Sequence, residues 1–136
     1  LIPPGLNNRL IVEVTEEQAI EDYDAVKQAM DRIKEKAWVA IDDVGAGFAG
    51  LQHLMRLDPD ILKIDGEIIH GIAHDPARRA IAKALVEFAR ETGSVLIAEG
   101  VETKADLNAI QELGIRFAQG YLLGRPAMPM ASRLAC

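Results

Sequence analysis

The stretch Val39-Ala40-Ile41-Asp42-Asp43-Val44-Gly45-Ala46-Gly47-Phe48 joins an apolar run to two adjacent carboxylates and two glycines. The apolar residues do not alternate with polar ones, which predicts a short strand buried on both faces. Adjacent strand residues point to opposite faces, so Asp42 and Asp43 can face the same side only if the chain bends between them. Two neighbouring carboxylates repel each other and are costly to desolvate, and a hard cation such as Mg²⁺, Mn²⁺ or Ca²⁺ relieves that cost. A solvated turn with an Asp helix cap is an equally open interpretation of this stretch alone.

Predicted strands and helices alternate along the rest of the chain. Glycine, proline and aspartate stand between the apolar segments, and these residues commonly end or begin regular structure. Alternation of this kind is typical of βαβ units that build a parallel sheet, so the sequence predicts an α/β fold. The expected strands are 9–16, 38–41, 61–65, 95–102 and 115–120, and the expected helices are 17–36, 48–57, 76–92 and 103–113.

Polar side chains follow the predicted strands at their C-terminal ends. Active sites of (β/α) barrels are built at that face, whereas an open doubly wound sheet usually uses one crevice. Polar residues at all five predicted strand ends therefore favour a barrel. An eight-stranded barrel needs about 250 residues, so about five strand–helix units in 136 residues predict only part of one. The polar residues are Glu13, Asp42, Asp43, Lys63, Glu99 and Gln119.

The composition limits the classes of partner. The chain is 49% hydrophobic and 26% charged, which is typical of a globular protein. Its net charge of -6 argues against binding a nucleic acid polymer, but not against binding a single nucleotide at a metal site. A single cysteine, Cys136, excludes an internal disulfide and fits a reducing cytoplasm. The sequence has no apolar run long enough to cross a membrane, so we expect a cytoplasmic domain, whose parent chain could be membrane-tethered.

Five motifs, in this order, resemble the C-terminal signature of EAL domains, the bacterial phosphodiesterases of cyclic di-GMP. The resemblance covers nearly the whole chain. It implies that residues 1–136 are the C-terminal part of a TIM-like barrel with one antiparallel strand, lacking its N-terminal strands. The motifs are Glu13-Val14-Thr15-Glu16, Asp42-Asp43-Val44-Gly45-Ala46-Gly47-Phe48, Lys63-Ile64-Asp65, Ala98-Glu99-Gly100-Val101-Glu102-Thr103 and Gln119-Gly120-Tyr121-Leu122-Leu123-Gly124-Arg125-Pro126.

The same resemblance implies a function. It is hydrolysis of cyclic di-GMP to linear pGpG at a two-metal site holding Mg or Mn, in bacterial second-messenger signalling. It also implies a homodimer, and a parent chain with further sensory or GGDEF-type domains. A phosphodiester is an anion, so an acidic pocket can bind it only through cations, and two metals about 4 Å apart can activate water and stabilise the leaving oxygen.

The resemblance assigns a role to each motif residue. Lys63 matches the lysine that holds the hydrolytic water or the phosphate, and a lysine among carboxylates stays charged. Glu16 matches the glutamate that anchors the loop after the second predicted strand, and Gln119 matches a residue near the substrate. The implied metal ligands are Glu13, Asp42, Asp43 and Glu99, of which Glu99, like Lys63, is also implied to be catalytic.

Two departures from the family pattern stand out. The Glu-Ala-Leu motif and the asparagine ligand of the family's N-terminal strands are absent from these 136 residues, which fits a piece of a longer chain. We therefore expect the piece alone to be inactive, because a metal with too few ligands binds weakly, and to associate through open sheet edges. Ala46 stands where a threonine is common, in a loop that couples dimerisation to metal binding in the family.

Other interpretations remain open. The domain could be a catalytically silent receptor for cyclic di-GMP or a protein-interaction module, or an enolase-like metal barrel. Lys63 could instead pair with Asp65, and Glu13 and Glu16 could be a charge pair at a helix N-terminus. The three histidines, His53, His70 and His74, lack the spacing of metal ligands and are interpreted as surface or packing residues.

Overall fold

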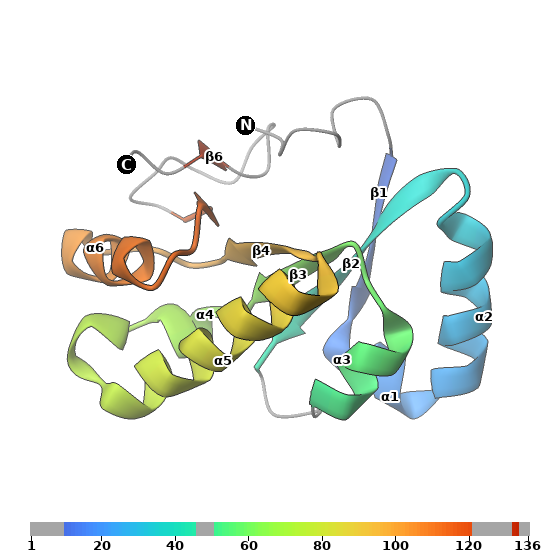
Figure 1. Ribbon diagram of the computed structural model, residues 1–136, viewed down its shortest axis with the longest axis horizontal. Helices are drawn as coiled ribbons and strands as arrows, with labels where there is room; N and C mark the ends of the chain where they lie inside the picture. Colours follow the sequence, from blue (N-terminus) through green and yellow to red (C-terminus); the bar gives the residue numbers. More distant parts are fainter. Residues whose placement is uncertain (1–9, 46–50, 121–131, 134–136) are drawn as a thin grey trace.

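The computed structural model describes residues 10–45, 51–120 and 132–133, which form one sheet and its flanking helices (Figure 1). The strands are β1 (Leu10–Thr15), β2 (Ala37–Val44), β3 (Ile61–Ile64), β4 (Val95–Ala98), β5 (Phe117–Ala118) and β6 (Ser132–Arg133). The helices are α1 (Glu16–Glu21), α2 (Tyr23–Ile33), α3 (Leu51–Leu57), α4 (Gly66–Ile69), the 3-10 turn η1 (Ile72–His74), α5 (Pro76–Thr92) and α6 (Lys104–Glu112).

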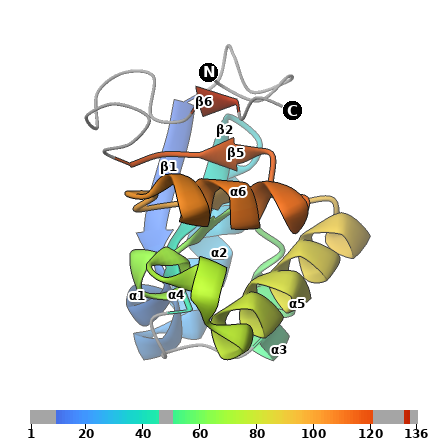
Figure 2. The ribbon, with the colours of Figure 1, turned by 90° about the vertical axis from the view of Figure 1, so that its left-hand side faces the viewer.

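The strands follow one another across the sheet in chain order, from β1 to β6. Strands β1 to β5 are parallel, and β6 pairs antiparallel with β5. A doubly wound sheet reverses its strand order at a switch point, whereas a (β/α) barrel adds each strand beside the last. The predicted α/β fold is confirmed, and the order favours the barrel. In Figure 2, β1 and β5 run in clearly different directions, so the sheet is strongly twisted.

The two faces of the sheet have different surroundings. One face packs against the helices, and its core includes Ile41 and Leu62 from the strands with Met30, Leu85 and Ile110 from the helices. The opposite face carries a separate small cluster formed by strand residues. That cluster consists of Ala40, Ile61 and Ile97, with Ile11, Trp38, Val95 and Phe117 packed against it.

Local signals explain where most helices begin and end. Asp75 accepts hydrogen bonds from the backbone N–H groups of Ala77 and Arg78 at the start of α5, and Gly93 ends this helix with φ 78°. Thr103 caps α6 by accepting from the N–H of Asp106. The predicted helices at 76–92 and 103–113 are therefore confirmed within a residue or two.

The predicted helix over 17–36 is wrong as a single element. It is two helices, broken at Asp22, whose side chain accepts from the N–H of Ala25 at 3.3 Å and caps α2. Aspartate competes with the backbone for such hydrogen bonds, so it favours a helix start over a helix interior. Between β3 and α5, where the sequence predicted no helix or strand, the structure has α4 and η1, and β6 was not predicted either. The predicted helix at 48–57 is described from Leu51 onward, and residues 48–50 lie outside the described part.

Candidate active site

Five polar side chains reach one face of the sheet because of the strand pleat. Side chains two residues apart in a strand point to the same face. Each of these polar residues stands two positions after an apolar residue of the small strand cluster, so the two lie on the same face. Glu13 stands two positions after Ile11, and Asp42 stands two positions after Ala40, both on the face away from the helices. Lys63, Glu99 and Gln119 stand in the same relation to Ile61, Ile97 and Phe117. The predicted gathering of polar residues at the strand ends thus has a simple geometric origin.

The adjacent aspartates come together through an irregularity in β2. The register between β2 and β3 shifts between Ile41 and Val44, and Asp43 has φ 57°. The N–H of Asp43 donates to Oδ1 of Asp42 at 2.9 Å. The predicted bend between the two aspartates is therefore present. Asp42, Asp43 and Glu99 each offer a carboxylate oxygen, and these oxygens lie within 4.8 Å of one another.

Lys63 supplies positive charge at the centre of this group. Its side chain is only 6% exposed, and its Nζ lies 2.8 Å from Oε1 of Glu13 and 2.8 Å from Oε1 of Glu99. Oδ1 of Asp42 is 3.9 Å from the same nitrogen. The alternative pairing of Lys63 with Asp65 is not what the structure shows, because Asp65 caps α4 by accepting from the N–H of Glu67 at 3.0 Å.

The burial and mutual contacts of these groups shift their pKa values. Burial raises the pKa of Glu99 to about 7, because the attraction of Lys63 only partly offsets desolvation and the neighbouring Asp42 adds to the rise. Burial alone would lower the pKa of Lys63, but its hydrogen bonds with Glu13 and Glu99 outweigh that effect and raise it. Lys63 is therefore a permanent cation here, while burial favours the protonated form of Glu99 when the site holds no metal.

Asp43 and Gln119 complete the description of the group. The pKa of Asp43 is raised by burial, by Asp42 and by the nearby carboxyl of Asp65. Gln119 donates from Nε2 to Oε1 of Glu99 at 3.3 Å, the same oxygen that lies 2.8 Å from Nζ of Lys63. Gln119 thus lies at the acidic group, and its predicted contact with the substrate stays a prediction.

Glu13 and Glu16 occupy different places. Glu13 lies beside Lys63 and does not belong to the compact group of three carboxylates found among the described residues. Glu16 is buried, 1% exposed, at the start of α1, where Thr15 forms a capping box with Gln18. The loop that Glu16 is predicted to anchor includes residues 46–50, which lie outside the described part. The roles of both glutamates therefore remain predictions.

The donor set fits a divalent metal. Glu13, Asp42, Asp43 and Glu99 bring four carboxylates around one ammonium group, so negative charge exceeds positive charge even when Glu99 is protonated. All the available ligand atoms are carboxylate oxygens, which suit Mg²⁺, Mn²⁺ and Ca²⁺. Asp42, Asp43 and Glu99 are the residues placed to hold such an ion.

Sequence reasoning missed two contributors to the site's surroundings. Asp65 faces Asp43, and His70 lies with Nε2 3.6 Å from Oε1 of Glu102, just beyond Glu99. The side chain of His70 is half-exposed. The signal for Asp65 was its position two residues after Lys63, on the same face of an extended chain.

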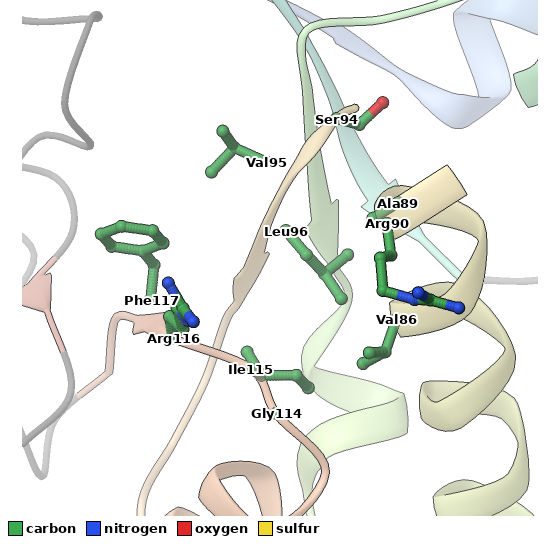
Figure 3. A pocket seen from close by; sticks show the side chains of 10 residues that line it. All are labelled: Val86, Ala89, Arg90, Ser94, Val95, Leu96, Gly114, Ile115, Arg116 and Phe117. Atoms are coloured by element: carbon green, nitrogen blue, oxygen red, sulfur yellow. The ribbon is translucent and has the colours of Figure 1, made fainter. Parts of the chain in front are cut away.

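A pocket at the other end of the strands is unrelated to this site. It has a volume of about 390 Å³ and opens between α5 and the starts of β4 and β5 (Figure 3). Its described lining includes none of the predicted site residues. Apolar side chains dominate it, with two arginines at its margin, and the main ones are Val86, Leu96, Ile115, Phe117, Arg90 and Arg116.

The fold and the site together define a class of protein. Parallel strands in barrel order carry an acidic, lysine-centred group at their C-terminal ends, as in a TIM-like barrel with its site at that face. The family model of the EAL domain matches residues 4–126. The chain therefore belongs to the EAL domain family, and the predicted family is confirmed.

Curated relatives support this membership. The chain is 40% identical over 129 residues to the bifunctional diguanylate cyclase/cyclic di-GMP phosphodiesterase MucR of Pseudomonas aeruginosa. This match covers 94% of the chain and 19% of the relative. It is 35% identical over 121 residues to the cyclic di-GMP phosphodiesterase PdeB of Shewanella oneidensis, covering 88% of the chain and 14% of that protein. The chain thus spans about a fifth of the length of these relatives or less.

Solved structures give the same result for the fold. The phosphodiesterase PaMucR in a c-di-GMP complex aligns with a TM-score of 0.78 at 40% identity, over 85% of this chain and 47% of that one. The BlrP1 protein of Klebsiella pneumoniae, in a manganese/cy-diGMP complex, aligns with a TM-score of 0.79 at 35% identity, over 82% of this chain and 29% of that one. The predicted partial TIM-like barrel is confirmed. Within the described residues, we find no helix that is long and apolar enough to span a membrane.

Proposed function

We propose that this chain carries most of the active site of a metal-dependent, cyclic-guanylate-specific phosphodiesterase that hydrolyses cyclic di-GMP to linear pGpG. One observation carries the proposal: the carboxylates of Asp42, Asp43 and Glu99 lie within 4.8 Å of one another, with Lys63 against Glu99. The names of relatives, which include several cyclic di-GMP phosphodiesterases, supply the substrate. Bacterial second-messenger signalling is the corresponding role.

Asp42, Asp43 and Glu99 would hold Mg²⁺ or Mn²⁺, with Glu13 as a further ligand of a two-metal site. Such ions, when bound, lower the pKa of a coordinated water and screen the charge of the phosphodiester. BlrP1 has been solved with manganese and also with calcium, in both cases with cy-diGMP. The donor set of this chain contains the oxygen ligands that these ions prefer.

The reaction adds water across one phosphodiester bond. The water oxygen forms a new bond to phosphorus, and the bond from phosphorus to the 3′ oxygen breaks. The proton that the attacking water loses passes to the 3′ oxygen, which leaves as a hydroxyl. Glu99 is proposed to act both as a metal ligand and in catalysis, with its carboxylate held by Lys63 and Gln119. Lys63 stays charged and holds the water or a phosphate oxygen, which stabilises negative charge in the transition state. Gln119 orients Glu99 and contacts the substrate.

The remaining proposals concern the whole protein. We place it in the cytoplasm or tethered to the cytoplasmic side of a membrane. We also propose a homodimer, in a parent chain with GGDEF-type or sensory domains. The bifunctional relative MucR, described as both cyclase and phosphodiesterase, supports a multidomain parent. Glu16 is proposed to anchor the loop after β2, since it is buried at the start of α1 and α1 contacts β2.

A second candidate is a catalytically silent EAL domain that acts as a receptor for cyclic di-GMP or as a protein-interaction module. The placement of Glu13 favours it: Glu13 pairs with Lys63 and lies outside the compact carboxylate group among the described residues. A site that holds a metal through too few ligands binds it weakly.

The two candidates differ in product. The complete protein is incubated with cyclic di-GMP and Mg²⁺ or Mn²⁺, and the nucleotides are separated by liquid chromatography. The enzyme forms linear pGpG, and removal of the metal with EDTA stops it. Binding of cyclic di-GMP in calorimetry without any pGpG would contradict the phosphodiesterase and support the receptor.

A further inference from the structure

The short helix α4 lies between the two segments that carry the acidic group. One segment is the irregular end of β2, with Asp42 and Asp43, and the other is the exit of β4, with Glu99. These segments come from strands that are not neighbours, because β3 separates them in the sheet. Helix α4 directly follows β3, so it is placed to touch both sides (Figure 1).

On the β2 side, α4 packs against the backbone beyond Asp43. The N–H of Asp65 donates to the carbonyl of Val44 at 2.8 Å. Ile68 lies against Gly45, where an added Cβ would come within 2.7 Å of Ile68 Cγ1. Both Asp43 and Gly45 have positive φ values, 57° and 100°, which ordinary residues avoid. A backbone held in this conformation needs support from its surroundings.

On the β4 side, α4 and its C-terminal residue His70 also lie close to the backbone. A Cβ on Gly100 would lie 3.0 Å from Nε2 of His70 and 3.2 Å from the Cα of Gly66. Gly100 directly follows Glu99, and the N–H of Glu99 donates to the carbonyl of Ile64 at 3.1 Å. Nε2 of His70 also lies 3.6 Å from Oε1 of Glu102. The exit of β4 is therefore held against α4 and its C-terminal residue.

The far end of this segment is fixed to α6. Asp106, 4% exposed, accepts hydrogen bonds from the N–H groups of Gly71 and Ala73 at 3.1 and 3.0 Å. Helix α4 is thus anchored on the side away from the acidic group and contacts a ligand-bearing segment on each of its other two sides.

We propose that Ile68 and His70 are positioning residues: through α4 they set the separation between the β2 carboxylates and Glu99, and thereby the affinity of the site for its metal. Neither side chain acts as a ligand itself. Ile68 supports the strained backbone at Asp43 and Gly45, and His70 supports Gly100 beside Glu99. This inference rests on the proposed metal-dependent function.

Metal binding by the complete protein tests the role of Ile68. Mn²⁺ affinity is measured by electron paramagnetic resonance of the free ion, without substrate. We expect Ile68→Ala to weaken Mn²⁺ binding by about 10-fold or more, as for other residues that orient metal ligands. Ile68→Val keeps a γ carbon against Gly45 and should restore most of the affinity. Ile69→Ala, a buried neighbour on α4 without the Gly45 contact, is the control for lost core packing.

The outcomes separate this inference from the proposed function. If Ile68→Ala binds Mn²⁺ as the wild type does, or if Ile69→Ala loses as much affinity at the same thermal stability, the positioning role is overturned. A wild-type protein that binds no Mn²⁺ overturns the proposed function and this inference together.

His70 is tested by kinetics. His70→Ala should lower kcat more than it raises KM, because it displaces Glu99 without removing a substrate contact. His74→Ala, an exposed histidine on η1, is the matched control and should behave as the wild type. Equal kcat values for His70→Ala and His74→Ala would remove His70 from the proposal.

Discussion

Nζ of Lys63 lies 2.8 Å from Oε1 of Glu99; Lys63 stands on β3, and Glu99 directly follows the neighbouring parallel strand β4. The same nitrogen is 2.8 Å from Glu13 on β1, across the intervening strand β2. Oδ1 of Asp42 on β2 lies 3.9 Å away, so one buried ammonium group links carboxylates from three parts of the sheet. It offsets part of their repulsion and leaves an excess of negative charge that a metal can neutralise.

Replacing Lys63 with alanine should remove most turnover and leave metal binding. The ammonium group stabilises charge in the transition state, and loss of one such interaction lowers kcat by about 10²–10³-fold. Steady-state rates and Mn²⁺ binding are both measured. Lys27→Ala, which removes an exposed pair with Asp31, should have no effect on either. A Lys63→Ala protein that no longer binds Mn²⁺ would show that the lysine organises the ligands instead.

Exchanging the metal should separate binding from catalysis. Mg²⁺ and Mn²⁺ are expected to support hydrolysis, whereas Ca²⁺ should occupy the site and inhibit. Ca²⁺ is larger and more flexible in its coordination, so it positions water less well. The test is a Ca²⁺ titration of the Mn²⁺-loaded enzyme at fixed substrate. Activity with Ca²⁺ equal to that with Mn²⁺ would argue against a geometrically demanding site.

Asp106→Asn should destabilise the protein at neutral pH. The two oxygens of the Asp106 carboxylate accept separately from the N–H groups of Gly71 and Ala73. Asparagine keeps one acceptor oxygen and puts an NH2 group in place of the other, so one buried N–H loses its partner, which costs about 1–3 kcal/mol. Urea unfolding of the complete protein at pH 7 measures the loss. Asp31→Asn, at an exposed site on α2, is the control and should change little.

The difference in unfolding free energy between the wild type and Asp106→Asn should become smaller at acidic pH. Burial would raise the pKa of Asp106, but the hydrogen bonds from Ala73, Gly71 and Thr103 outweigh it, so the pKa is lowered. A group whose pKa is lowered by folding stabilises the protein above its unfolded pKa. That stabilisation is lost as the pH falls through the folded-state value. A difference in unfolding free energy that stays constant down to strongly acidic pH would contradict this role.

Substitution by alanine should destabilise the protein much more at Gly120 than at Gly93. A Cβ on Gly120 would lie 2.3 Å from the carbonyl oxygen and 2.4 Å from the nitrogen of Val101, so Gly120→Ala must displace backbone beside the site. Gly93 also has positive φ, 78°, but nothing lies within 4 Å of its Cβ position. Gly93→Ala should therefore cost only the conformational strain of about 1–2 kcal/mol, and Gly120→Ala considerably more. Thermal unfolding measures the stability of both variants. Equal losses of stability would show that the close contact between Gly120 and the backbone of Val101 does not constrain this position.

The sequence predicted the parts of this structure that local chemistry determines. Asp75, Pro76 and Gly93 mark the ends of α5, and the placement of Glu13, Lys63 and Glu99 follows from counting two residues along a strand. The need for a bend between Asp42 and Asp43 followed from the same pleat. These features depend on a few neighbouring residues, so a single sequence is enough to predict them.

The remaining features depend on contacts between distant segments. The positive φ of Asp43 is supported by α4, and no local pattern in 66–69 indicated that helix. The pairing of Lys63 with Glu13 joins residues 50 positions apart. Asp22 lies within a sequence whose apolar residues recur at helical spacing. Its capping role is evident only from the hydrogen bond that its side chain accepts from the N–H of Ala25. Such features need the fold before they can be assigned.

Substituting Glu99 in the complete protein gives the sharpest test of a hydrolytic metal centre. Wild type and Glu99→Gln are compared at saturating Mn²⁺, with cyclic di-GMP and its products followed by liquid chromatography and mass spectrometry. We predict linear pGpG from the wild type, none in EDTA, and at most a trace from Glu99→Gln while the variant remains folded. Equal pGpG formation by the two proteins, or intact cyclic di-GMP with the metal-loaded wild type, would contradict the assignment.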